Sequence, residues 1–147
     1  MNFNTQVKLN IYETIAQTAS PPSSAEVAVS LAAPVDRVEA AFQELAKKRL
    51  LVLEPGSSSH IRMAPPFSGV ETPFKVNLET QTYYANCVWD ALGVPAALHR
   101  DGVVNTSCPD CGAAMTLQIR DGKPVPQDCA VHFAVPAAHW WDDIVYT

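Results

Sequence analysis

A proline-rich segment at residues 63–73 divides the chain into two parts with different sequence character. Proline fixes its own φ angle and has no backbone N–H group, so this segment interrupts regular helix or sheet. All four cysteines and all three tryptophans lie after it. The pattern predicts two regions with different structural plans, residues 1–66 and residues 67–147.

The composition favours a folded, globular protein, although the charged fraction is below the roughly 25% typical of soluble domains. Of the 147 residues, 48% are hydrophobic and 17% are charged, which favours one compact domain or two small domains that share a core. A chain this apolar can bury enough surface to offset its ordering entropy, so a disordered chain is excluded. The net charge of −5 provides no general attraction to nucleic acid or to an anionic membrane.

The expected compartment follows from two features of the sequence. No apolar stretch approaches the roughly 20 residues that a membrane span needs, and the N-terminus has no hydrophobic signal region. We therefore expect a cytoplasmic protein with no membrane partner. In that reducing compartment the four cysteines are expected to be ligands, nucleophiles or buried thiols instead of disulfides.

Residues 1–66 carry the pattern of three helices followed by a hairpin. Apolar spacing predicts a first helix over residues 8–18. Ser23 and Glu26 match a capping box that opens a second helix. Pro34 suits the first position of a third helix. This part of the chain is therefore predicted to begin with a three-helix unit.

Two short segments, residues 50–53 and 60–63, are predicted to pair as a hairpin after the third helix. This order is typical of a winged helix-turn-helix. DNA binding needs a positive surface, but the third helix mixes acidic and basic side chains, and the hairpin offers only His60 and Arg62. We do not expect a nucleic-acid partner, and a metal-sensing winged-helix regulator remains an alternative.

Residues 67–147 predict a small mixed or antiparallel sheet with one buried helix. Strands are expected at residues 74–78 and 115–119, and the helix at residues 85–98. A hairpin turn at residues 121–122 is expected to lead to a returning strand at residues 130–135. The predicted fold class is α+β, with the winged-helix-like region packed on this core.

Cys87 and Asp90 are the most suggestive local pair. Residues three apart on a helix share a face, so the thiol and the carboxyl would converge. A thiolate is a soft ligand and nucleophile, and a carboxylic acid can carry a proton, so the pair could bind a soft electrophile and protonate a leaving group. The structural alternative is a small core cysteine beside a buried hydrogen-bond acceptor.

Cys108 and Cys111 form a C-x2-C pattern in a tight turn, where two thiolates can ligate one metal ion. Cys129 and His132 could complete a zinc site, but a regular strand over residues 130–135 would point these two side chains to opposite faces. Zinc at Cys108 and Cys111, and paired thiols with a structural or redox role, both remain open.

Several stretches together resemble the alkylmercury (organomercurial) lyase family. The resemblance covers the second part of the chain and extends to the N-terminal region. Its most specific portion is Ala-Asn-Cys-Val-Trp-Asp-Ala-Leu, in which we expect Trp89 to be structural. The stretches are residues 63–76, 84–96, 107–111, 132–136 and 140–143.

This resemblance implies protonolysis of a carbon–mercury bond, which releases a hydrocarbon and leaves Hg(II) on protein thiolates. Cys87 and Asp90 match the family's first catalytic cysteine and its aspartate, and Cys108 matches a buried structural cysteine. No cofactor is implied. The substrate would be a small organometallic compound, and a mercuric reductase or cellular thiols would accept the metal. The winged-helix region would contribute to the core without binding DNA.

The family's second catalytic cysteine is expected directly after Thr147, where this sequence stops. Either the sequence is truncated there, or the protein lacks that thiol and Cys111 or Cys129 substitutes for it. A further alternative is a non-catalytic protein of the same fold that holds a soft metal. Its ligands would be drawn from the cysteines Cys87, Cys108, Cys111 and Cys129.

Overall fold

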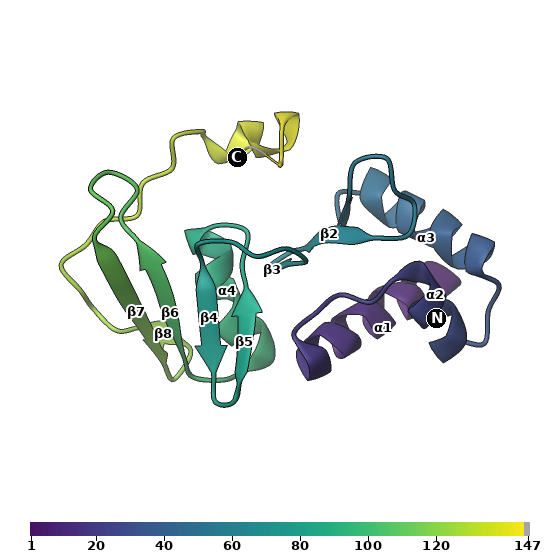
Figure 1. Cartoon of the computed structure of the whole chain (residues 1–147), viewed down its shortest axis with the longest axis horizontal. Helices are drawn as coiled ribbons and strands as arrows, with labels where there is room; N and C mark the ends of the chain where they lie inside the picture. The colour runs from purple at the N-terminus through teal and green to yellow at the C-terminus, as the bar shows by residue number, and fades with distance from the viewer. Residues whose placement is uncertain (146–147) are drawn as a thin grey trace.

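Three helices form the N-terminal part of the computed structural model, which describes residues 1–145 (Figure 1). They are α1 (Phe3–Thr18), α2 (Ser24–Ser30) and α3 (Val35–Lys47). Each turns an apolar face inward, and the fully buried side chains include Ile11 on α1 and Phe42 on α3. The predicted three-helix order is confirmed.

Local capping explains where these helices begin. The backbone N–H groups of Ser23 and Glu26 donate to each other's side chains, at 2.7 and 3.3 Å, so the predicted capping box is confirmed. Pro34 is the N-cap of α3, one position before its predicted place. The first helix starts earlier than predicted because the Asn2 side chain accepts a hydrogen bond from the Thr5 backbone N–H at 2.8 Å.

A small antiparallel sheet follows the helices. Its strands are β1 (Val52–Leu53), β2 (Ile61–Ala64) and β3 (Phe67–Ser68), in that spatial order. The predicted hairpin is therefore present, with a third strand added. Three helices followed by strands agree with the expected element order, and the winged-helix assignment itself remains a prediction.

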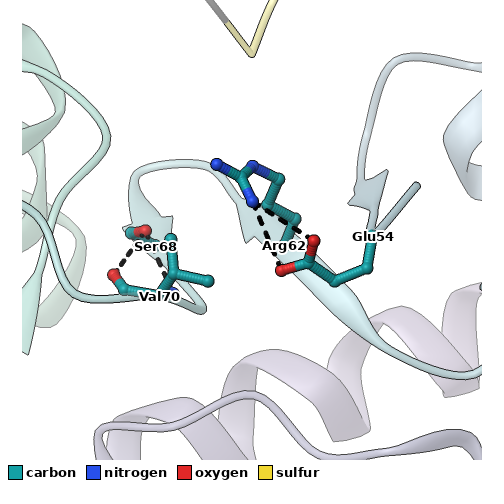
Figure 2. Close-up of polar contacts among 4 residues, drawn as sticks. All are labelled: Glu54, Arg62, Ser68 and Val70. Carbon is teal, nitrogen blue, oxygen red and sulfur yellow. Dashed lines mark hydrogen bonds and ion pairs between the residues drawn. The ribbon is translucent and has the colours of Figure 1, made fainter.

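Two polar contacts lie on this small sheet, one beside β2 and one at the end of β3, where the chain continues into its second part (Figure 2). Arg62 on β2 donates from Nη1 to Glu54 Oε2 at 3.2 Å, and both side chains are partly exposed. Ser68 at the end of β3 donates to the Val70 carbonyl at 2.8 Å. The Ser68 contact lies within the proline-rich segment at residues 63–73, which therefore contributes β3 and the end of β2 to the sheet.

The second part of the chain is built on a five-stranded antiparallel sheet with the order β5-β4-β6-β7-β8. Helix α4 (Val88–Leu98) joins β5 to β6 and packs on β4. The strands are β4 (Lys75–Leu78), β5 (Gln81–Tyr84), β6 (Gly102–Ser107), β7 (Ala114–Arg120) and β8 (Lys123–Pro124). The predicted α+β class is confirmed.

The predicted returning strand at residues 130–135 is wrong. The turn at residues 121–122 does reverse the chain, but β8 covers only Lys123–Pro124. Pro124 and Pro126 lack backbone N–H groups, so the ladder cannot be extended in a regular way beyond this point. Residues 125–136 have no regular structure, and a 3-10 helix, η1 (Ala137–Asp142), follows.

The two parts of the chain share one hydrophobic core. The Tyr83 hydroxyl donates to the Ala16 carbonyl at 2.9 Å, and the Tyr12 hydroxyl donates to the Pro65 carbonyl at 2.9 Å. The Phe67 ring lies between those two tyrosine rings, with centroid distances of 5.7 and 6.2 Å. A boundary at residues 66 and 67 therefore passes through a packed interface, and it remains a prediction.

Within residues 1–145, no helix combines the length and the apolar character needed to cross a lipid bilayer.

Candidate active site

Cys87 lies at the junction between β5 and α4. Its backbone is extended, with φ −152° and ψ −178°, and it is the N-cap of α4. The helix predicted from residue 85 starts only at Val88, because Ala85 is held by the sheets: it pairs with Phe67, and its N–H donates to the Phe74 carbonyl at 3.0 Å. Cys87 is therefore not on a helical face, contrary to the sequence argument.

Asp90 lies in the first turn of α4, so the thiol and the carboxyl still come together. Both side chains are half-buried, and both line the same cavity. The sulfur sits at the helix N-terminus, where backbone N–H groups face outward along the axis. Cys87 and Asp90 therefore come together as the spacing suggested, but through the N-cap position of Cys87 and not through a shared helical face.

Asn86 completes this group and was missed from the sequence. Its Nδ2 donates to Asp90 Oδ2 at 2.9 Å and to the Phe67 carbonyl at 3.3 Å. Two acceptors therefore fix the amide and hold the carboxyl in place. Its position four residues before Asp90, next to Cys87, was the available signal, because residues four apart meet across one helical turn.

Burial shifts both reactive groups toward their protonated forms. Desolvation raises the pKa of Asp90, and the Asn86 hydrogen bond opposes that rise only in part. Desolvation also raises the pKa of Cys87; the Asp90 backbone N–H lowers it, the Asp90 carboxylate raises it, and the Trp89 N–H lowers it. An acid whose pKa is raised toward neutrality can both accept and deliver a proton.

The cavity has a volume of about 560 Å³ and is lined mainly by apolar and aromatic side chains. The C-terminal segment forms one wall, which includes Phe133, Trp140 and Trp141. The Phe133 and Trp140 rings are 5.2 Å apart, and Trp140 Nε1 donates to the Val135 carbonyl at 2.8 Å. Figure 1 shows this segment passing the end of the sheet from which α4 starts.

The remaining predicted site residues differ in how exposed they are and in whether they line the cavity. Cys108 and Cys111 lie in the turn between β6 and β7, partly exposed and exposed respectively, so Cys108 is not fully buried as the resemblance implied. Cys129 is exposed. Trp89 is 63% exposed and borders the cavity, so it is not a core residue.

The structure does not support the alternative of a four-ligand zinc site. His132 lines the cavity instead of joining the thiols of the turn. The described part of the chain contains no group of three or more His, Cys, Asp or Glu side chains that could hold a metal ion. Structural zinc takes four ligands, and Cys108 and Cys111 therefore lack the partners that zinc would need.

The fold and the site define a class: an α+β protein that presents a thiol and a carboxyl to an apolar cavity. The alkylmercury lyase family model matches residues 67–147, more than half of the chain. The chain therefore belongs to the alkylmercury lyase family, as the sequence motifs predicted. No curated protein matches it.

A solved structure with the same fold is the mercury-bound form of MerB2. The TM-score is 0.63 at 20% sequence identity, and the match covers 81% of this chain. It covers 58% of the MerB2 chain, so this chain spans less than two thirds of that protein. The likeness confirms the α+β fold.

Proposed function

We propose that this chain cleaves carbon–mercury bonds by protonolysis, with Cys87 as the thiolate and Asp90 as the proton carrier. The observation that supports this best is that both groups line one apolar cavity, where burial raises the pKa of the carboxyl. Family membership points to the same chemistry. An apolar cavity suits the hydrocarbon group of an organomercurial, because its burial is favourable.

The reaction would proceed in two proton transfers. Asp90 takes the proton of the Cys87 thiol, and the sulfur bonds to mercury as the original counter-ligand leaves. Asp90 then delivers that proton to the carbon, the carbon–mercury bond breaks, and its electron pair forms the new C–H bond. The departing carbon never becomes a free carbanion, because the acid is already beside it.

A second thiolate completes the product. Among the described cavity-lining residues, Cys87 is the one cysteine, so we propose that a dissolved thiol supplies the second sulfur and releases its own proton. One organomercurial and two thiols then yield one hydrocarbon, one Hg(II) bis-thiolate and the protonated counter-ligand. Thiols of the cytoplasm, or a mercuric reductase, are the proposed acceptors of the ion.

The test is benzene release from phenylmercuric acetate in the presence of excess monothiol, using the full natural gene product. Cys87→Ser and Asp90→Asn should each lower the rate by about 10²-fold or more, as expected when a proton-transfer group is lost. Cys129→Ser is the matched control and should retain the rate, because Cys129 is exposed and does not line the cavity. Absence of benzene from the folded protein would refute the lyase proposal and favour a non-catalytic soft-metal-binding protein.

A further inference from the structure

The turn between β6 and β7 carries two thiols that the proposed reaction does not use. Cys108 and Cys111 are both free, and the turn is closed by two backbone hydrogen bonds of 2.8 Å. One runs from the Cys108 N–H to the Ala113 carbonyl, and the other from the Gly112 N–H to the Cys108 carbonyl. Gly112 has φ +71°, a conformation that favours glycine, so the turn is defined by its own sequence.

The geometry of the turn suits two sulfurs that bind one ion. A two-residue gap in a tight turn lets two cysteine side chains approach a single ion. The two backbone hydrogen bonds hold Cys108 and Cys111 in such a turn. Because the turn is exposed, a cation from solution can reach it without passing through the core.

The sheet places this turn at the same end of the molecule as Cys87. Strands β5 and β6 both run antiparallel to β4, and Tyr84 and Asn105 pair with Lys75 from its two sides. Cys87 follows Tyr84 by three residues, and Cys108 follows Asn105 by three residues. Because β4 lies between them, β5 and β6 are separated by two strand spacings, roughly 10 Å. Figure 1 shows that both strands finish at the same end of the sheet.

The number of protein ligands in this turn indicates which class of metal ion it could bind. No third His, Cys, Asp or Glu of the described residues joins the two sulfurs, so the four ligands of structural zinc are not available. Thiolates select soft cations, and Hg(II) is satisfied by two of them. We propose that Cys108 and Cys111 form a second site, a surface dithiol that chelates Hg(II) at the same end of the sheet as the cavity.

Binding at this site forms two S–Hg bonds and breaks the two bonds that Hg(II) made to its ligands in solution, and the two thiol protons pass to the displaced ligands or to solvent. The site goes beyond the proposed lyase reaction, and its binding property can be measured when that reaction is absent. Chelation is the expected advantage, because after the first bond forms the second is intramolecular, and affinity then exceeds that of single thiols by about 10²-fold or more.

The experiment uses reduced Cys87→Ser protein, which has no cavity thiol. HgCl2 is added with an excess of a monothiol, the protein is desalted, and retained mercury is measured by elemental analysis and by the ultraviolet thiolate–mercury charge-transfer band. We expect about one Hg(II) per chain. Adding Cys111→Ser should lower the affinity about 10²-fold, whereas adding Cys129→Ser should leave it unchanged.

Cys108→Ser is the second variant, with circular dichroism as the check on folding; because Cys111 is exposed, Cys111→Ser carries the test if Cys108→Ser does not fold. Retention that is unchanged in Cys111→Ser, or that is lost in Cys129→Ser, would overturn the proposal. Stoichiometric zinc that depends on both cysteines and resists HgCl2 would also overturn it. Absence of benzene release from the protein with Cys87 intact, together with mercury retention by the Cys87→Ser protein, would refute the lyase proposal alone.

Discussion

The raised pKa of Asp90, which suits it to proton transfer, lowers the stability of the folded protein. A carboxyl with a raised pKa in the folded state binds more protons there than in the unfolded state, over the pH range between the two pKa values. Stability therefore falls as the pH rises through that range, and above it the ionised carboxylate destabilises the fold. Below both pKa values the penalty is absent.

Replacing Asp90 with asparagine should therefore raise the melting temperature at pH 7 and give no gain at a pH below both pKa values. The new side-chain amide would keep an acceptor for the Asn86 amide, which now donates to the carboxylate at 2.9 Å. Thermal unfolding at the two pH values is the measurement. The exposed Asp128→Asn is the control, and a lower melting temperature for Asp90→Asn at pH 7 would contradict this account.

The thiol provides a second test at the residue scale. Burial raises the pKa of Cys87, and the Asp90 carboxylate adds to that rise. Asp90→Asn should therefore lower the pKa of Cys87, so that alkylation by iodoacetamide extends to lower pH. The comparison is made in a background with Cys108, Cys111 and Cys129 changed to serine, and a shift to higher pH would count against it.

Single elements are defined largely by their caps. The capping box at the start of α2 ties the Ser23 and Glu26 side chains to each other's backbone N–H groups. Ser23→Ala should reduce the free energy of unfolding by about 1 kcal/mol. Ser23→Asn should keep most of the stability, because asparagine is an equally good N-cap residue. Urea unfolding of both variants is the measurement, and equal losses would show that the cap hydrogen bond is not the cause.

The element scale is also where sequence-based prediction was most and least successful. The capping box and the turn at residues 121–122 were predictable because each depends on a few adjacent residues. The start of α4 was not, because Ala85 is held by Phe67 and Phe74 from distant parts of the chain. Residues 130–135 have the composition of a strand but have no strand partner in the described structure.

At the scale of the whole molecule, contacts between the two parts predict a single cooperative unfolding transition. Buried side chains from both parts belong to one core, and Tyr83 bonds to the carbonyl of Ala16 on α1. The three tryptophans lie in the second part, and three of the four α-helices found within residues 1–145 lie in the first. Tryptophan fluorescence and helical circular dichroism therefore report on different parts of the chain.

Unfolding midpoints from the two signals should coincide in a urea titration. Tyr83→Phe, which removes the hydrogen bond to Ala16, should lower both midpoints together, by about 1 kcal/mol in the free energy of unfolding. Gln127→Ala is a suitable control, since its side chain bonds to Thr116 within the second part. Two separate midpoints in the unmodified protein would instead support independent domains at residues 1–66 and 67–147.

The sequence by itself determined the α+β class, the local caps and turns, and the stretch that carries Cys87 and Asp90, because each of these depends on neighbouring residues or on a recognisable motif. Only the tertiary structure decided the rest. It made Cys87 a helix cap, brought Asn86 to the carboxyl, placed His132 at the cavity and separated it from Cys108 and Cys111. Apart from the Asn86–Asp90 contact, which a four-residue spacing could have indicated, those outcomes depend on contacts between segments far apart in the chain, which periodicity and spacing do not encode.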